Sequence, residues 1–387
     1  MSILDLWEQS KEQVKNKHVQ QVIAFSGDGQ LKDGSDTSDE FRAFLSAIPS
    51  DLLQKYADQC MKNSFTDSGL ALQDIINQVG NRLGFEVSYG RYRGAQKHIG
   101  YDGLWKFPDD HHLVVEVKTT DAYRINLNTV VGYRKSLIKK DLVSENESSI
   151  LIVVGRKDTG DLEAQIRGSR FAWDIRLISV DALIRLMFLK QEVEDPKIVK
   201  RIYDILIPRE FTKLDEIVEI LFSTAEDVKD AEPDEEEPSD DPKVPKFHPV
   251  SFHDACVTKI EAHLERSLVK NTRSTYSTSD KTIAVVCSVS KEHIRSGVPS
   301  YWFAFHPHQK EFLENSEKSY VAFGCGSSQI IPLIPGAKFI QLLDGLNITQ
   351  KEDRFYWHVH ISYDNKNLLL RRKQGAEPIN FTEYLLK

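Results

Sequence analysis

A segment that cannot fold by itself divides this chain in two. Residues 225–245 read AEDVKDAEPDEEEPSDDPKVP, with ten carboxylates, two lysines and few apolar side chains. Such a segment buries too little apolar surface to offset the conformational entropy lost on ordering. We therefore expect an acidic disordered linker over residues 223–247. The rest of the chain must then fold as separate domains on either side of it.

The linker also accounts for the net charge of the protein. The 387 residues sum to -8 at pH 7, and residues 225–245 contribute 2 - 10 = -8, which leaves about zero for the rest of the chain. Overall acidity is therefore no argument against a nucleic-acid partner. The segment is most simply a solvated tether. The alternative is a DNA-mimicking tail that occupies a basic cleft until it is displaced.

Composition narrows the class of protein. Hydrophobic residues at 40% and charged residues at 28% are ordinary for globular domains, and this excludes wholesale disorder. No apolar run approaches the roughly 18 residues of a membrane span, and the start, MSILDLWEQSKEQ, lacks the features of a secretory signal. The cysteines have no metal-site spacing, so we expect them to be reduced and buried in a soluble, cytoplasmic protein. They are Cys60, Cys256, Cys287 and Cys325.

Ahead of the linker, the sequence predicts a helical N-terminal extension (residues 1–64) and then a domain of alternating helices and strands (65–222). Residues 70–83 place apolar side chains at helical spacing, and Gly84 follows where a C-terminal cap is expected. The run SILIVV at 149–154 is typical of a strand buried on both faces. Further strands are predicted at 85–89, 99–104, 113–118 and 175–179, and further helices at 129–142 and 162–171.

After the linker, residues 248–387 predict a second, β-rich α+β domain with a recognition or regulatory role. A helix is expected over 254–268, and aromatic runs such as YWFAFHPH and RFYWHVHIS are typical of antiparallel strands. The aromatic residues are most simply a β-domain core. Two alternatives stay open: a metal site built from the histidines, and a pocket that stacks on an extruded base. The histidines are His306, His308, His358 and His360.

One stretch of the first domain combines residue types suited to phosphodiester chemistry. In IGYDGLWKFPDDHHLVVEVKTT, Asp102 is separated by thirteen residues from a Glu-x-Lys that closes an apolar strand. Residues i and i+2 of a strand point to the same side, so Glu116 and Lys118 project together. If the two strands pair through a turn near residues 108–111, Asp102 lies opposite Glu116.

These groups match the needs of metal-dependent hydrolysis. The carboxylates of Asp102 and Glu116, with the backbone carbonyl of Val117, suit Mg²⁺, and we expect Mn²⁺ to substitute. The metal would serve as a Lewis acid and orient a nucleophilic water. Lys118 could position or deprotonate that water and stabilise charge developing on the phosphate. The alternative is a surface salt-bridge pair on an edge strand.

The DG…VVEVK pattern in an α/β context resembles the PD-(D/E)XK nuclease superfamily, which includes restriction enzymes, Holliday-junction resolvases and Mrr-like nucleases. The resemblance covers about residues 65–190 and implies a restriction-endonuclease-like mixed central sheet flanked by helices. It also implies that Asp102 and Glu116 are metal ligands and that Lys118 is the catalytic lysine. Members often carry a further acid about eleven residues ahead of a Gly-Phe pair. Here that position is Gln73, so either Gln73 contributes its carbonyl oxygen or Asp74 substitutes.

Basic side chains concentrate around this stretch. Such side chains give salt-dependent, sequence-independent affinity for a phosphate backbone. The alternative for any one of them is an ordinary solvated surface charge. The residues expected to contact DNA are Arg91, Arg93, Lys97, Arg124, Arg134 and Arg167.

The leading hypothesis is a Mg²⁺-dependent DNA endonuclease in bacterial restriction or anti-phage defence, acting on double-stranded DNA. Cutting both strands requires two active sites or sequential nicking, so a homodimer is expected. A second hypothesis is a nucleic-acid-binding or partner-regulated protein whose nuclease domain is degenerate or conditionally active, with Gln73 as its main support. A third is a nuclease that a partner protein releases from inhibition by the acidic linker. No membrane partner is expected.

Overall fold

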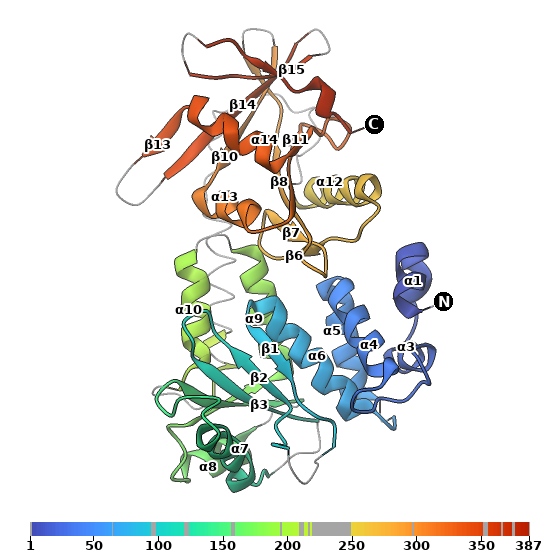
Figure 1. The fold of residues 1–387 in the computed structure, drawn as a ribbon, viewed down its shortest axis with the longest axis vertical. Coiled ribbons are helices and arrows are strands. Elements are labelled where there is room, and N and C mark those ends of the chain that lie inside the picture. Colours follow the sequence, from blue (N-terminus) through green and yellow to red (C-terminus); the bar gives the residue numbers. More distant parts are fainter. Residues whose placement is uncertain are drawn as a thin grey trace. The chain divides into compact units, whose positions relative to one another are not determined.

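The chain divides into two compact units, residues 1–235 and 236–387 (Figure 1). The structure is a computed structural model. It describes residues 2–63, 65–93, 98–119, 124–155, 159–193, 196–208, 213–215, 217–218, 249–295, 298–350, 355–364, 367–373 and 376–386. The expected linker, residues 223–247, lies outside the described residues. Within the described part, no helix has the length and apolar character needed to cross a membrane.

The N-terminal residues are helical, as the sequence predicts, but they share a core with later helices of the first unit. Trp7, Phe44 and Tyr56 belong to the same buried cluster as Leu72 and Leu183. The helices between residues 3 and 62 are therefore packed into the first unit. The helices are α1 (Ile3–Gln9), α2 (Lys11–Lys15), α3 (Val19–Phe25), α4 (Asp36–Ala47) and α5 (Ser50–Lys62).

A mixed five-stranded sheet in the order β1-β2-β3-β4-β5 forms the centre of the first unit. The first three strands are antiparallel neighbours, and β3, β4 and β5 run parallel. All seven residues of β4 are buried, which confirms the prediction from SILIVV. The strands are β1 (Glu86–Tyr89), β2 (Gly103–Lys106), β3 (His112–Lys118), β4 (Ser148–Val154) and β5 (Ile175–Ser179).

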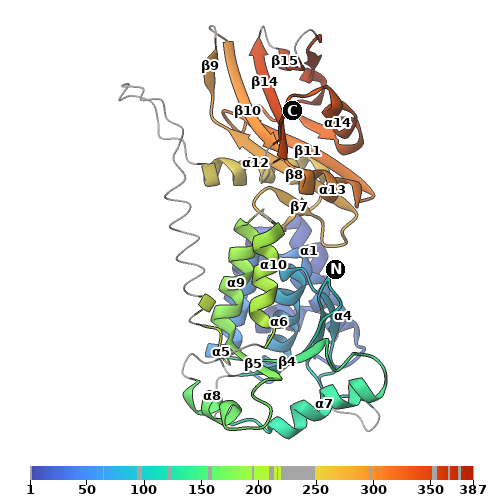
Figure 2. The same cartoon turned by 90° about the vertical axis from the view of Figure 1, so that its left-hand side faces the viewer.

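Helices cover both faces of this sheet (Figure 2). One face packs against α6 (Ser68–Leu83) and α9 (Val180–Glu192), with α10 (Pro196–Leu206) beside α9. The other packs against α7 (Leu127–Lys139) and α8 (Gly160–Arg167). Alternate residues of β3 divide between the two cores, because successive side chains of a strand point to opposite faces: Val115 faces α6 and Val114 faces α7.

Two local predictions have different outcomes. Helix α6 ends where expected, because Gly84 adopts the left-handed conformation (φ 104°) that caps a helix at low cost. The strand predicted over residues 99–104 is displaced: β2 begins only at Gly103. Apolar alternation placed it too early, because the side chains of Ile99 and Tyr101 pack against the α7 core from irregular backbone.

The described residues of the second unit form two sheets. The first, in the order β12-β11-β8-β7-β6, has one parallel pair, β8 with β11. The second, in the order β16-β15-β14-β10-β9 with β13 also paired to β14, is antiparallel throughout. The predicted dominance of antiparallel pairing is confirmed. The strands are β6 (Val269–Lys270), β7 (Thr275–Ser277), β8 (Ile283–Ser290), β9 (His293–Arg295), β10 (Val298–Phe305), β11 (Lys318–Cys325), β12 (Leu333–Pro335), β13 (Ile348–Gln350), β14 (Phe355–Asp364), β15 (Asn367–Leu370) and β16 (Ile379–Asn380).

The main core of the second unit joins inward-facing side chains of both sheets, including Val286, Phe303, Phe323 and Ile361. A smaller core lies under α12 (Pro249–Leu264), which begins earlier than predicted. The four cysteines are free and buried, as expected. The remaining short elements are α13 (Pro307–Glu314), α14 (Gly336–Leu342) and the 3-10 turns η1 (Leu343–Gly345) and η2 (Thr382–Tyr384).

Candidate active site

The hairpin of β2 and β3 brings Asp102 and Glu116 together. The paired register ends with Gly103 opposite Val115, and directly before it Asp102 lies close enough to Glu116 for the charge of Glu116 to raise the pKa of Asp102. The turn is closed by a hydrogen bond from the Phe107 amide to the His111 carbonyl at 2.8 Å. This turn lies within the residues 108–111 where the sequence predicts it.

Asp102 bonds to β3 through both its backbone and its side chain. The Asp102 backbone amide donates to the Val115 carbonyl (3.0 Å), and the Asp102 carboxylate Oδ2 accepts the amide of Val117 (2.7 Å). The N–H and C=O of one strand residue point to the same side. The Val117 carbonyl therefore points toward Asp102, which leaves a carboxylate and a carbonyl together at the end of β2.

Three donors hold the backbone carbonyl of Asp102. They are the Gly90 amide (3.0 Å), the Gln73 side-chain amide (3.1 Å) and the Asn77 side-chain amide (2.9 Å). The approach is so close that a Cβ at Gly103 would lie 2.1 Å from Asn77 Oδ1. Asp102 is thus held by α6 and by the backbone directly after β1.

Glu116 and Lys118 share one face of β3, as their spacing predicts. Lys118 Nζ lies 2.5 Å from Glu116 Oε1. The other carboxylate oxygen, Oε2, is buried and has no hydrogen-bond partner among the described residues. A buried anionic oxygen without a donor is costly. With the Asp102 carboxylate and the Val117 carbonyl nearby, these oxygens fit a hard divalent cation such as Mg²⁺.

The electrostatics reflect two carboxylates in a confined space. Burial, and then the neighbouring charge of Glu116, raise the pKa of Asp102 to about 7, against the opposing effects of the Val117 amide and Lys118. For Lys118, burial lowers the pKa, but Glu116 and Asp102 outweigh it and the pKa lies above its ordinary value. The lysine is therefore cationic at neutral pH.

Gln73 and Asp74 are adjacent on helix α6 but their side chains have different partners. Gln73 contacts Asp102, which keeps it at the site. Asp74 instead accepts from Arg42 Nε at 3.1 Å on each oxygen and from the Tyr92 hydroxyl. Burial raises the pKa of Asp74 to about 6 despite these partners. The expectation that Asp74 substitutes as a metal ligand is not met, because adjacent residues of a helix face different directions.

The residues expected to contact DNA have different environments. Arg134 is a correction: it is buried and bonded to Ser148, Asp174 and the Glu145 carbonyl, so it holds the structure of the unit and is not available to a phosphate. The other described ones are at least partly accessible: Arg91, Arg93, Arg124 and Arg167. Lys97 lies outside the described residues.

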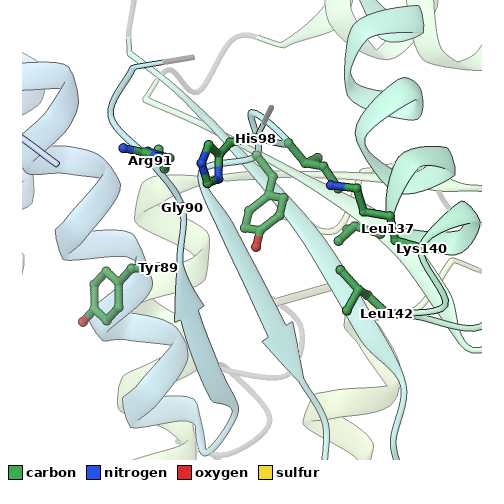
Figure 3. Close-up of a pocket in the computed structure, with 9 residues that line it drawn as sticks. Tyr89, Gly90, Arg91, His98, Leu137, Lys140 and Leu142 are labelled. Atoms are coloured by element: carbon green, nitrogen blue, oxygen red, sulfur yellow. The ribbon is translucent and has the colours of Figure 1, made fainter. Parts of the chain in front are cut away.

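A cavity of about 290 Å³ opens next to the segment that leads into Asp102. Figure 3 shows Arg91 and His98 on one side of it and Lys140 on the other, with the Tyr89 ring directed away. Arg91 also pairs with Asp33 at 3.4 Å. The lining is completed by Gly90, Ile99, Tyr101, Leu137 and Leu142.

Two residues at the site were not predicted. The Asn77 side-chain amide donates to the Asp102 carbonyl. The sequence feature that points to Asn77 is its position four residues after Gln73, one helical turn further along the same face of α6. Tyr133 on α7 lies near the charges: its pKa is raised by partial burial and by Glu116 and Asp102, offset by Lys118. An α7 tyrosine had no sequence signal, because its proximity comes from packing alone.

Few side chains of the described residues are arranged to bind a metal ion. Among the described residues, no group of three or more His, Cys, Asp or Glu side chains is arranged to hold a metal ion. The histidines of the second unit are therefore not supported as a metal site. Among the described residues of the first unit, the oxygen-bearing groups around Asp102 and Glu116 include the two carboxylates, the Val117 carbonyl and the Gln73 amide.

Comparisons with known proteins add little. No protein-family model matches the sequence, and no curated protein matches it. One similar solved structure is a complex of the restriction endonuclease PspGI with substrate DNA, at 14% identity over 58% of this chain and 92% of that chain, with a TM-score of 0.24. A TM-score this low carries no argument about function, so the function has to be inferred from the site itself.

Proposed function

We propose that this protein is a metal-dependent DNA endonuclease of the PD-(D/E)XK type. The observation that carries the proposal is the β2–β3 hairpin, where the Asp102 carboxylate accepts the amide of Val117, the residue between Glu116 and Lys118. The buried Glu116 Oε2 without a donor among the described residues supports a cation between the carboxylates. We further propose a restriction-endonuclease-like fold for the first unit and a defence role in a bacterial cytoplasm.

Each side chain has a definable role in this proposal. Asp102, Glu116 and the Val117 carbonyl would hold Mg²⁺, with Gln73 beside them. When bound, the ion would supply Lewis acidity at the phosphate and orient a water. Lys118 is cationic, so it would stabilise negative charge that develops on the phosphate oxygens. Arg91, Arg93 and Arg124 would contribute phosphate contacts that weaken with salt.

Plasmid cleavage tests the proposal. The wild-type chain should nick or linearise plasmid in Mg²⁺ and in Mn²⁺ but not in EDTA. Asp102→Ala, Glu116→Ala and Lys118→Ala should each lower the rate by at least about 100-fold, the effect typical of losing an electrostatic stabiliser, and should leave DNA binding largely intact. Glu86→Ala is the matched control, because Glu86 is an exposed acid on β1 of the same sheet. Cleavage that survives all three changes would sink the proposal.

A thermal-shift measurement tests the metal separately from activity. Mg²⁺ that binds only the folded state should raise the unfolding temperature progressively as its concentration exceeds the Kd. Asp102→Asn should abolish this shift while keeping the shape of the side chain. An equal shift in Asp102→Asn would contradict metal binding at this site.

A second candidate is a nucleic-acid-binding protein with a degenerate nuclease site. The observation that favours it is Gln73, whose amide nitrogen donates to the Asp102 carbonyl and which brings no negative charge. In that case the chain would bind DNA and give no cleavage in either metal. Gln73→Glu would then be the informative variant, since an added carboxylate should create or raise Mg²⁺-dependent cleavage.

A further inference from the structure

One face of the antiparallel sheet in the second unit carries a row of rings. In β10, Tyr301, Phe303 and Phe305 are buried, whereas Trp302 points outward with 39% of its surface exposed. Register places Trp302 opposite His360 and Ala304 opposite His358. Residues directly opposite in an antiparallel pair lie on the same face. We call this outward row, Trp302, His306, Tyr356, His358 and His360, the ring face.

The rings of this face contact one another. Trp302 lies 6.2 Å from Tyr356 and 5.9 Å from His358, measured between ring centroids. His358 stacks parallel to His360 at 6.0 Å. Hydrogen bonds from Trp302 Nε1 to His358 Nδ1 (3.2 Å) and between Thr349 and His358 Nε2 (2.7 Å) hold the central ring in place. The rings are therefore oriented before any ligand arrives, which lowers the entropy cost of binding.

A cationic side chain continues the ring face at one edge. The Arg371 amide donates to the His360 carbonyl at 2.8 Å, so Arg371 extends the β15 ladder directly opposite His360. Because opposite residues share a face, the guanidinium lies on the same side of the sheet as the rings. Arg371 is exposed to solvent, which leaves its charge accessible to a ligand.

The charge on this face is complementary to an anion. The strands β10 and β13 contain no acidic residue, and in β14 the acid is the last residue, Asp364, at the end of the strand away from Trp302 and Tyr356. The ring face is also no metal site, because no suitable group of His, Cys, Asp or Glu occurs in the described part of the chain. Figure 2 shows β9, β10, β14 and β15 side by side in this unit.

We propose that the ring face binds single-stranded DNA, with bases stacked on Trp302 and Tyr356 and a phosphate neutralised by Arg371. An open sheet with exposed rings and a flanking cation accepts unstacked bases of any sequence, because every base has a π-face. Stacked bases in a duplex cannot reach these rings. The site lies in the second unit and is independent of the catalytic proposal for Asp102, Glu116 and Lys118.

Fluorescence anisotropy tests the binding of single-stranded DNA by the full chain in EDTA. The probe is a labelled oligothymidylate of about 16 nucleotides, near the upper end of the site sizes of single-strand-binding folds. Trp302→Ala and Tyr356→Ala should each weaken binding about tenfold, the usual effect of losing one stacking partner. Arg371→Ala should weaken binding and reduce its dependence on salt. Trp302→Phe should keep most of the affinity because it retains a ring.

Two matched controls separate the ring face from general effects. Trp173→Ala removes another exposed tryptophan, 71% exposed, from the first unit. Lys318→Ala removes an exposed cation from the other sheet of the second unit. Both should bind the oligonucleotide like the wild type. Circular dichroism should show that each variant is folded, as expected for substitutions of accessible side chains.

The outcomes are decisive in either direction. Unchanged binding by Trp302→Ala, Tyr356→Ala and Arg371→Ala would overturn the proposal. So would an equal loss of duplex binding in these variants, or tighter binding of an oligouridylate than of the DNA. If the wild type cleaves no DNA but binds the oligothymidylate, and Trp302→Ala weakens this binding, only the nuclease proposal is refuted.

Discussion

At the scale of single residues, Asn77 joins α6 to β2 and to the residue before β2 through one amide group. Its nitrogen donates to the Asp102 carbonyl at 2.9 Å, and its oxygen accepts from Trp105 Nε1 at 2.9 Å. Trp105 is fully buried, so its N–H has no access to water in place of Asn77. The position of Asp102 thus depends on a residue that does not itself face the reacting groups.

Asn77→Ala should lower the free energy of unfolding by about 1–3 kcal/mol, because it leaves a buried donor unsatisfied. It should also slow plasmid cleavage, because α6 then holds Asp102 by Gln73 alone. Urea denaturation and the cleavage rate measure the two effects. Gln78→Ala is the control, since Gln78 is buried on the same helix but bonds to Asn81 and Tyr89. Cleavage at the wild-type rate in Asn77→Ala would contradict the positioning role.

At the scale of elements, α6 packs closely on β2 of the hairpin. The Trp105 ring lies directly against Gly80 of α6, where an added Cβ would come within 2.6 Å of it. Gly132 of α7, on the other face of the sheet, has open space around it. Two helical glycines therefore have opposite roles: one permits a contact and the other only costs helix stability.

Gly80→Ala should destabilise the protein by about 1–3 kcal/mol, the usual cost of overpacking a core. Gly132→Ala should stabilise it by about 0.5–1 kcal/mol, because alanine loses less backbone entropy in a helix. Chemical denaturation of both variants gives the comparison. Effects of the same sign in the two variants would refute this difference between the helices.

At the scale of the whole molecule, the acidic segment lies between two separately built cores. The described core of the first unit ends at Val218, and the first described core contact of the second is Phe252. Residues 219–248, which include the acidic segment, lie outside the described residues. Because the composition of residues 225–245 offers little apolar surface to bury, we expect neither core to depend on them.

Deleting residues 225–245 should leave the unfolding temperature and the plasmid cleavage rate of the chain unchanged if the segment is a tether. Differential scanning calorimetry and the plasmid assay at low salt provide the readouts, with a neutral Gly/Ser replacement of equal length as the control. A higher cleavage rate in both variants would show instead that the acidic charges inhibit the enzyme by occupying a basic surface.

Much of the fold could be predicted from local patterns, and the errors have identifiable causes. The buried strand β4 and the capped end of α6 were predicted because strand burial and helix termination depend on neighbouring residues. The strand predicted at 99–104 was misplaced because apolar side chains also pack from irregular backbone. Arg134 was misassigned because a positive charge alone does not show whether the side chain reaches water or a buried partner.

The sequence by itself determined the residues of the candidate site and their order along two strands, since the spacing of Asp102, Glu116 and Lys118 is a property of strand geometry. Only the tertiary structure decided that Gln73 and Asn77 hold Asp102, that Asp74 pairs with Arg42, and that Trp302 faces outward. These contacts join residues far apart in the chain. Their geometry depends on how helices and sheets pack, which no local pattern encodes.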